Sequence, residues 1–191
     1  MTDPTMIVNA SHPLPLEWVP DDLVDLWKVQ PRHYLLYPRP MRLASCAAEA
    51  ANELFARAER QGLGDFMVLS AYRDGDCQAA LFASSPDGYA ARPGESEHQT
   101  GLAMDVAQFG RDTLLDDAHR IWLADNCWEH GFVVRYPEGR EDVTGFPAEP
   151  WHLRYVGRDA ALEMRNHGWV LEEWIARNVL ATHSANRRDC V

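Results

Sequence analysis

Apolar residues recur along this chain with two different periods, which separate the predicted helices from the predicted strands. Over 41–62 they recur at helical spacing in a segment rich in alanine, leucine and glutamate that ends at a glycine. This pattern predicts an amphipathic helix. The apolar run over 66–72 instead predicts a strand. Helix start and stop signals predict further helical segments over 74–83, 112–130 and 158–178.

The segment 102–107 alternates with a period of two, which predicts a strand. One face carries large apolar residues that begin at Leu102. The other face carries Ala103, Asp105 and Ala107, so small side chains flank a carboxylate and leave space for a metal ion. Gly101 permits a tight entry into this strand.

Two further strands are expected over 132–136 and 152–156. Helices arranged around a small, mainly antiparallel sheet define an α+β fold. We expect one domain over 1–191, because its length suits a single core and we find no internal repeat. The proline-rich segment 1–40 is expected to be extended and to lie over the core.

Charge excludes some partners. The chain has 18 Lys and Arg against 29 Asp and Glu, a net charge of −11, so a broad phosphate-binding surface and a nucleic-acid partner are not expected. No apolar run reaches the length of a transmembrane segment, and the first residues lack signal-peptide features. As it stands the chain is expected to be cytoplasmic; a chain that had lost an export signal or membrane anchor would look the same. No obligate protein partner is inferred.

The four cysteines form no Cys-x-x-Cys pair, so they indicate neither a zinc ribbon nor a thioredoxin motif. Free thiols are expected. If the protein is exported, a disulfide is an alternative, and the spacing does not choose among the three full pairings.

Two short segments carry the candidate chemistry. The segment 96–105 contributes His98 and Asp105, and the segment 149–152 contributes His152, a ligand set that suits Zn²⁺. Three protein ligands leave one coordination position open for water, which is typical of a catalytic zinc. Glu149 is the candidate general base, and Pro150 predicts that its segment is turn-like or extended.

Other hydrolase motifs are absent. The sequence has no His-Glu-x-x-His, and the segment 94–98 fails the Gly-x-Ser-x-Gly pattern at its last position. A single histidine is more often a packing or surface residue than a ligand. We assign that ordinary role to the other six: His12, His33, His119, His130, His167 and His183.

The pattern Ser-x-His-x-x-Gly-x-Ala-x-Asp followed by Glu-x-Trp-His resembles the VanY-type D-alanyl-D-alanine metallocarboxypeptidases, in the group that includes lysostaphin and the sonic hedgehog domain. Linking blocks at 70–73, 131–137, 144–145 and 151–157 are similar to the family in the same order, and the likeness extends over about 8–174. The resemblance implies a hedgehog/DD-peptidase-like fold and a zinc carboxypeptidase activity.

The resemblance also implies roles for further residues. Arg73 is expected to steady the oxyanion or the terminal carboxylate of a substrate, and Ser96 to help bind that carboxylate. Gln78 is a further candidate for substrate binding, although a position on the polar face of a helix explains this residue too. Thr100 is another candidate, although a position in a turn explains it equally well. Trp151 is expected to form a wall of the cleft, with a core aromatic as the alternative. The segment 73–76 departs from the serine-containing family segment, so substrate contacts there are expected to differ.

The leading hypothesis is a zinc D,D-carboxypeptidase that acts on peptidoglycan-type stem peptides or precursors ending in D-Ala-D-Ala. L,D-carboxypeptidase action on tetrapeptide stems and D-Ala-D-Ala dipeptidase action are alternatives that need the same metal and base. A non-catalytic zinc domain that binds a partner is an alternative of another class. The retention of Glu149 beside an open metal site argues against it.

Overall fold

The structure, a computed structural model, describes residues 2–85, 90–111 and 114–186, with side chains described up to residue 178. Its central sheet has five strands in the order β2-β4-β5-β7-β6, and only the β2–β4 pair is parallel. In that order the strands are Leu35–Leu36, Phe66–Ser70, Ala103–Gln108, Glu149–Tyr155 and Phe132–Tyr136. A separate two-stranded sheet pairs β1 (Leu23–Asp25) with β3 (Arg42–Ala44). The predicted α+β class with a mainly antiparallel sheet is confirmed.

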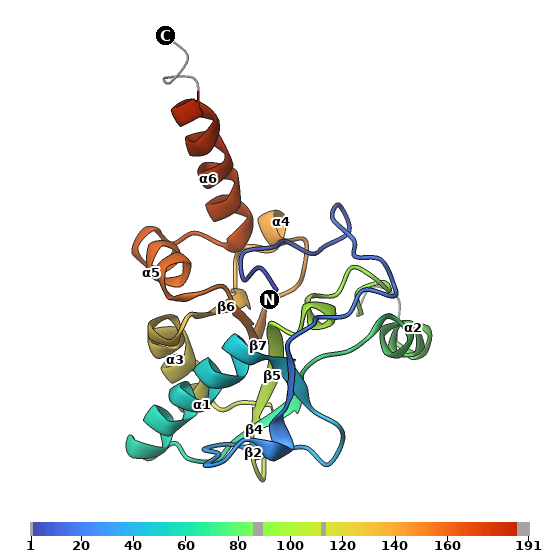
Figure 1. The fold of residues 1–191 in the computed structure, drawn as a ribbon. Helices are drawn as coiled ribbons and strands as arrows, with labels where there is room; N and C mark the ends of the chain where they lie inside the picture. The colour runs from blue at the N-terminus through green and yellow to red at the C-terminus, as the bar shows by residue number, and fades with distance from the viewer. Residues whose placement is uncertain (1, 86–89, 112–113, 187–191) are drawn as a thin grey trace.

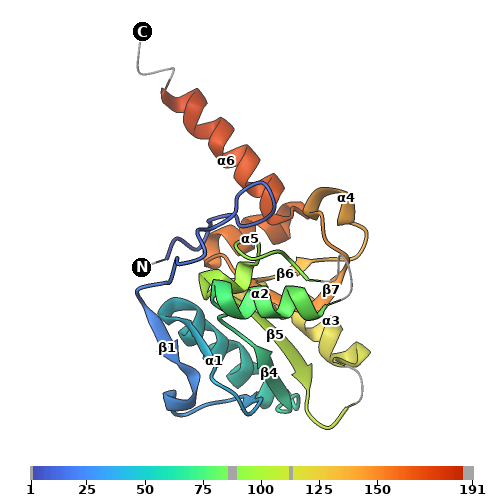
Figure 2. The same ribbon diagram turned by 90° about the vertical axis from the view of Figure 1, so that its right-hand side faces the viewer.

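Helices lie on both faces of this sheet. Figure 1 shows α1 and α3 on one side of the strands and α2 on the other, and the turned view in Figure 2 shows α2 in front of β5. Helix α6 projects away from the rest of the fold. The α-helices in chain order are Ser45–Arg60, Gly75–Ser84, Asp117–Asn126, Glu141–Thr144, Arg158–His167 and Leu171–Asn186. Three short 3-10 helices, η1, η2 and η3, span Leu26–Lys28, Glu97–Thr100 and Cys127–His130.

The main core lies between α1 and the sheet. Leu54 and Phe55 of α1 pack in one buried cluster with Phe66 of β4 and Met104 of β5, and each is at most 1% exposed. Burying a side chain of this size stabilises the fold by about 1.5–3 kcal/mol. This core therefore leaves the opposite face of β4 and β5 available for polar residues.

The N-terminal end of the helix predicted over 41–62 is a strand. Residues 42–44 form β3 and pair with β1, and α1 begins only at Ser45. The backbone N–H of Ser45 donates to the carbonyl of Asp22 at 3.0 Å, and its hydroxyl donates to the Asp22 carboxylate at 3.2 Å. Pairing with a distant segment therefore overrides the local helical pattern at this end.

The helix predicted over 112–130 is shorter and continues as a 3-10 turn. Residues 112–113 lie outside the described residues, and α3 begins after Asp116, whose carboxylate accepts a hydrogen bond from the backbone N–H of His119 at 2.9 Å. Gly131 ends the following η3 turn with a φ of 79°. The helical region predicted over 158–178 consists of two helices separated near Gly168, and the second continues to Asn186.

The N-terminal segment is held against the rest of the fold by hydrogen bonds of its backbone. The amide of Gln99 donates to the carbonyls of Pro15, Leu16 and Trp18 at 2.8–3.2 Å. The backbone N–H of Leu14 donates to the carbonyl of Gly94 at 2.8 Å. Among the described residues, no helix is both long enough and apolar enough to cross a membrane.

Candidate metal centre and active site

Strand register brings three polar residues into one row across the sheet. Ser70 of β4 is paired with Asp105 of β5, and Asp105 is paired with His152 of β7. Directly paired residues on neighbouring antiparallel strands have their Cβ atoms about 4.5–5.5 Å apart and point to the same face. The β-sheet therefore places a carboxylate next to an imidazole, although 47 residues separate them in sequence.

His98 reaches the same point from the η2 turn. Gly101 ends this turn with a φ of 69°, and a Cβ atom there would lie 3.1 Å from the backbone nitrogen of Ala44, so any other residue would be strained at this position. The Nδ1 atom of His98 donates to the carbonyl of Ala71 at 2.7 Å. This bond leaves Nε2 free to coordinate a metal, and Nε2 lies 3.1 Å from Oδ2 of Asp105.

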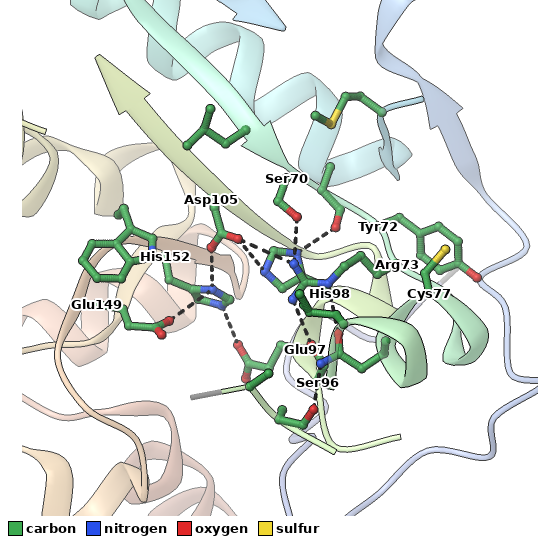
Figure 3. Close-up of a pocket in the computed structure, with 18 of the residues that line it drawn as sticks. Ser70, Tyr72, Arg73, Cys77, Ser96, Glu97, His98, Asp105, Glu149 and His152 are labelled. Carbon is green, nitrogen blue, oxygen red and sulfur yellow. Dashed lines mark hydrogen bonds and ion pairs between the residues drawn. The ribbon is translucent and has the colours of Figure 1, made fainter. Parts of the chain in front are cut away.

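The candidate ligand atoms of His98, Asp105 and His152 all lie within 4.8 Å of one another. Figure 3 shows these three side chains pointing toward one another. Nδ1 of His152 lies 3.0 Å from Oδ1 of Asp105, so this nitrogen faces the other two ligands. Two imidazoles and one carboxylate are a donor set that suits Zn²⁺ and leaves a coordination position for water or substrate.

Electrostatics at this point favour a cation. Burial lowers the pKa of His98 to about 4, so this ring is neutral at pH 7 and able to ligate a metal. Burial also tends to lower the pKa of His152, but the adjacent carboxylates of Asp105 and Glu97 raise it to about 9. The carboxylates that attract a proton to His152 also favour a divalent cation, so the residues present fit a zinc ion.

Glu149 begins β7, where it is paired with Tyr136 of β6. Its Oε2 atom lies 3.8 Å from Nδ1 of His152, beside the candidate ligands. Burial raises the pKa of Glu149, and the Asp105 carboxylate contributes in the same direction. A raised pKa makes the carboxylate a stronger base. The segment 149–152 is extended, which is one of the two conformations that the sequence predicted.

Arg73 lies just beyond β4 and is held by three polar side chains. Its Nη1 donates to the Ser70 hydroxyl at 2.9 Å, its Nε to the Gln78 side-chain carbonyl at 3.0 Å, and its Nη2 lies 3.5 Å from the Ser96 hydroxyl. Nη1 is also 3.8 Å from Oδ2 of Asp105. Burial lowers the pKa of Arg73; the charge of Asp105 opposes this shift and the charge of Arg39 adds to it. The guanidinium therefore stands beside the candidate metal centre.

One pocket of about 690 Å³ joins these groups. Trp151 lines it and is partly exposed, which suits a wall of the cleft. Gln78 also lines it, and its amide donates to the carbonyl of Ala91 at 2.7 Å, which leaves its oxygen facing Arg73. Thr100 stays in the η2 turn, where its hydroxyl accepts from the backbone N–H of Leu102 at 3.0 Å.

Glu97, Arg135 and Arg154 form a buried charged cluster that the sequence analysis did not identify. One carboxylate oxygen of Glu97 lies 2.8 Å from Nε of Arg135 and 2.9 Å from Nη1 of Arg154. All three residues are at most 2% exposed. The sequence could have predicted such a cluster, because a charged residue inside an apolar strand must find a partner when it is buried.

A mixed sheet and the adjoining η2 turn together place two histidines, an aspartate and an adjacent glutamate in one pocket, which defines a candidate metallohydrolase. Residues 40–158 match the sequence profile of the VanY family, described as D-alanyl-D-alanine carboxypeptidase. The chain belongs to this VanY carboxypeptidase family.

Related sequences agree with this assignment. The chain is 34% identical to YodJ of Bacillus subtilis (strain 168) over 90% of its own length, and 34% identical to a D-alanyl-D-alanine carboxypeptidase of Enterococcus faecium over 89%. It spans 66% and 56% of the lengths of these two relatives.

Solved structures are similar as well. The LdcB LD-carboxypeptidase superposes with a TM-score of 0.78 at 34% identity, over 89% of this chain and 84% of that one. A mutant of the VanY D,D-pentapeptidase in complex with Zn(II) superposes with a TM-score of 0.73 at 28% identity, over 90% and 98%. VanYB in complex with D-alanine-D-alanine superposes with a TM-score of 0.74 at 27% identity, over 90% and 97%.

Proposed function

We propose that this protein is a zinc-dependent D,D-carboxypeptidase that removes the terminal D-alanine from peptidoglycan-type peptides ending in D-Ala-D-Ala. The observation that carries the proposal is the position of Glu149, whose Oε2 lies 3.8 Å from Nδ1 of His152 in a three-ligand site. A purely structural zinc site does not need a base beside an open coordination position. Family membership and the zinc-bound VanY neighbour support this reading.

Each residue of the site has a role in this proposal. His98, Asp105 and His152 would hold the zinc ion, which when bound supplies a Lewis acid for the scissile carbonyl and makes water more acidic. Glu149 accepts a proton from the attacking water and returns it to the departing amine.

The terminal carboxylate of the substrate binds on the side of the candidate metal centre that is opposite Glu149 (Figure 3). Arg73 and Ser96 bind it. Because Arg73 lies 3.8 Å from Asp105, one of the candidate metal ligands, it is also close enough to the metal centre to stabilise negative charge that develops on the carbonyl oxygen. Gln78 fixes the orientation of the Arg73 guanidinium, and Trp151 forms a wall of the pocket. A peptide with a free C-terminus is therefore the expected substrate, cleaved one residue at a time.

L,D-carboxypeptidase activity on tetrapeptide stems is the second candidate. One observation favours it: identity to the LdcB LD-carboxypeptidase is 34%, against 28% and 27% for the two VanY structures. Both reactions use the same metal, base and carboxylate-binding residues. They differ in the configuration of the residue that contributes the scissile carbonyl, which the shape of the pocket must distinguish.

Product analysis separates the two candidates. The zinc-loaded protein is incubated with defined pentapeptide and tetrapeptide stems, and the products are identified by mass spectrometry. Loss of one D-alanine from the pentapeptide, at a higher kcat/KM than from the tetrapeptide, supports the D,D assignment. Preferential cleavage of the tetrapeptide favours the L,D candidate. Comparable cleavage of a C-terminally amidated pentapeptide would contradict carboxypeptidase action.

A further inference from the structure

The strand order places Arg73 and Tyr136 on opposite sides of the candidate metal centre. Arg73 follows β4, whereas Tyr136 ends β6, which forms one edge of the sheet. The candidate ligands Asp105 and His152 lie on β5 and β7, between these two strands. Glu149, the strand partner of Tyr136, lies in Figure 3 on the side of the ligands away from Arg73. A peptide whose terminal carboxylate binds Arg73 therefore extends across the metal centre toward Tyr136.

Tyr136 and Phe146 form an aromatic pair in this part of the molecule. Both residues line the pocket of the candidate metal centre. Their ring centres are 5.1 Å apart with an interplanar angle of 30°, and the centre of the Tyr136 ring lies 5.1 Å from that of the His152 ring. Tyr136 is 7% exposed, whereas Phe146 is only half-buried. Phe146 therefore offers apolar surface to a ligand on the side of the metal centre that faces away from Arg73.

The turn that precedes Phe146 fixes its position. Helix α4 ends at Gly145, whose φ of 74° lies in the left-handed region. The hydroxyl of the buried Thr144 donates to the carbonyl of Arg140 at 3.1 Å and accepts a hydrogen bond from the backbone N–H of Phe146 at 3.4 Å. Stacking on Tyr136 restrains the Phe146 ring as well. A side chain that is restrained before a ligand binds loses less conformational entropy on binding.

Chain geometry indicates which residue of a substrate reaches this pair. In a pentapeptide stem that loses its last residue, the fourth residue contributes the scissile carbonyl and so lies at the metal centre. An extended chain advances by at most about 3.3–3.6 Å per residue. Because the Tyr136 ring lies 5.1 Å from the His152 ring, the third residue lies beside Tyr136, and its side chain can extend over Phe146.

We propose that Tyr136 and Phe146 form an aromatic subsite for the aliphatic side chain of the third stem residue. This inference rests on the proposed function, because it places the terminal carboxylate at Arg73 and the fourth residue at the metal centre. Lysine and diaminopimelate, the two common third residues, both carry an unbranched run of methylene groups. Packing these groups against an aromatic ring removes apolar surface from water. Phe146 determines the specificity, since the Tyr136 ring is already covered by its neighbours.

The test uses three pentapeptide stems that differ only in the third residue, which is lysine, norleucine or alanine. Norleucine keeps the aliphatic chain of lysine without its charge, and alanine removes the chain. Acetyl-D-Ala-D-Ala ends before the subsite and gives the reference rate of each protein. We compare kcat/KM of the wild-type protein, Phe146→Ala and Phe146→Tyr. Phe109→Ala is the matched control, because Phe109 is 60% exposed and does not line the pocket.

The wild-type protein should cleave the lysine and norleucine stems with similar kcat/KM, and both about ten-fold or more faster than the alanine stem. Phe146→Ala should lose most of this preference, because the apolar surface is gone. Phe146→Tyr should retain it, and Phe109→Ala should behave as wild type. The change should lie mainly in KM, since the subsite does not touch the reacting atoms.

Equal kcat/KM values for the lysine and alanine stems would overturn the subsite, as would a Phe146→Ala protein that keeps the full preference. A preference for lysine that norleucine does not share would also overturn it, because the recognised group would then be the ammonium. As a second readout, calorimetry gives Kd of each stem for the zinc-loaded Glu149→Gln protein with and without Phe146→Ala. If no stem is cleaved but Kd still depends on the third side chain and on Phe146, the subsite stands and the proposed function fails.

Discussion

Oε2 of Glu97 lies 3.6 Å from Nε2 of His152, while Oε1 of the same carboxylate is held at 2.8 Å by Nε of Arg135 and at 2.9 Å by Nη1 of Arg154. Figure 3 shows Glu97 and Glu149 on two sides of the His152 ring. Among the described residues, neither Nε2 of His152 nor Oε2 of Glu97 has a hydrogen-bond partner. Two arginines therefore fix a carboxylate beside the ring nitrogen that does not face the candidate metal. A proton on Nε2 leaves Nδ1 free to act as a ligand.

Glu97→Gln should weaken zinc binding by about 10–100-fold, the usual effect of changing the outer carboxylate partner of a metal-bound histidine. Zinc affinity is measured by competition with a chelator, and circular dichroism checks the fold. Glu172→Gln is the control, because Glu172 pairs with Arg135 at 2.9 Å and does not face His152. Equal losses of zinc affinity in both variants would show that the cluster acts only through general stability.

Asp105→Asn and His98→Ala should each remove most of the bound zinc, because each variant loses one of three protein ligands. Metal content is measured by elemental analysis after gel filtration, together with peptide hydrolysis. His12→Ala is a suitable control, since this exposed ring contacts Asn9. A His98→Ala protein that holds one zinc per chain and keeps its activity would refute this ligand set.

Glu149→Gln should retain zinc and lose turnover. The amide has the same shape as the carboxylate but cannot accept the proton, so kcat should fall by roughly 10²–10⁴-fold. KM should change little if Glu149 acts only in proton transfer. Hydrolysis at the parental rate would mean that another group is the base, and loss of zinc would mean that Glu149 is needed to assemble the site.

The buried thiol of Cys127 should make the protein less stable at alkaline pH. Burial raises the pKa of Cys127 from 9.0 to about 12. Because the folded-state pKa is the higher one, this contribution is fully present below pH 9 and is lost as the pH rises toward 12. The loss approaches 1.4 kcal/mol per pH unit, which amounts to about 2 kcal/mol at pH 10.5.

Cys127→Ala isolates this effect from other alkaline titrations. The variant should be less stable than wild type at pH 8, because it leaves a small cavity in the core, and the difference should shrink by about 2 kcal/mol at pH 10.5. Urea unfolding under reducing conditions measures both free energies. A difference that stays constant with pH would contradict the assignment.

Cys46, Cys77 and Cys127 are all free thiols, and Cys190 lies outside the described residues.

Local patterns in the sequence were sufficient for much of the fold and for the three candidate ligands that the structure brings together. The period of two over 102–107 predicted a strand with Asp105 on the face opposite Leu102, and the structure has β5 over Ala103–Gln108 with Leu102 fully buried. The spacing of His98, Asp105 and His152 matched a family motif and predicted a zinc site. The sequence supports such predictions because side-chain periodicity and short motifs are properties of neighbouring residues.

Only the tertiary structure revealed the relationships between distant segments. Residues 42–44 have a helical pattern but form a strand, because β1 supplies hydrogen-bond partners from earlier in the chain. Glu97 is an acidic residue of ordinary appearance in the sequence, and its role beside His152 depends on Arg135 of β6 and Arg154 of β7. The free energy of a buried charge depends on the partners that surround it in space. That information belongs to the assembled fold, since no local pattern specifies which distant groups meet.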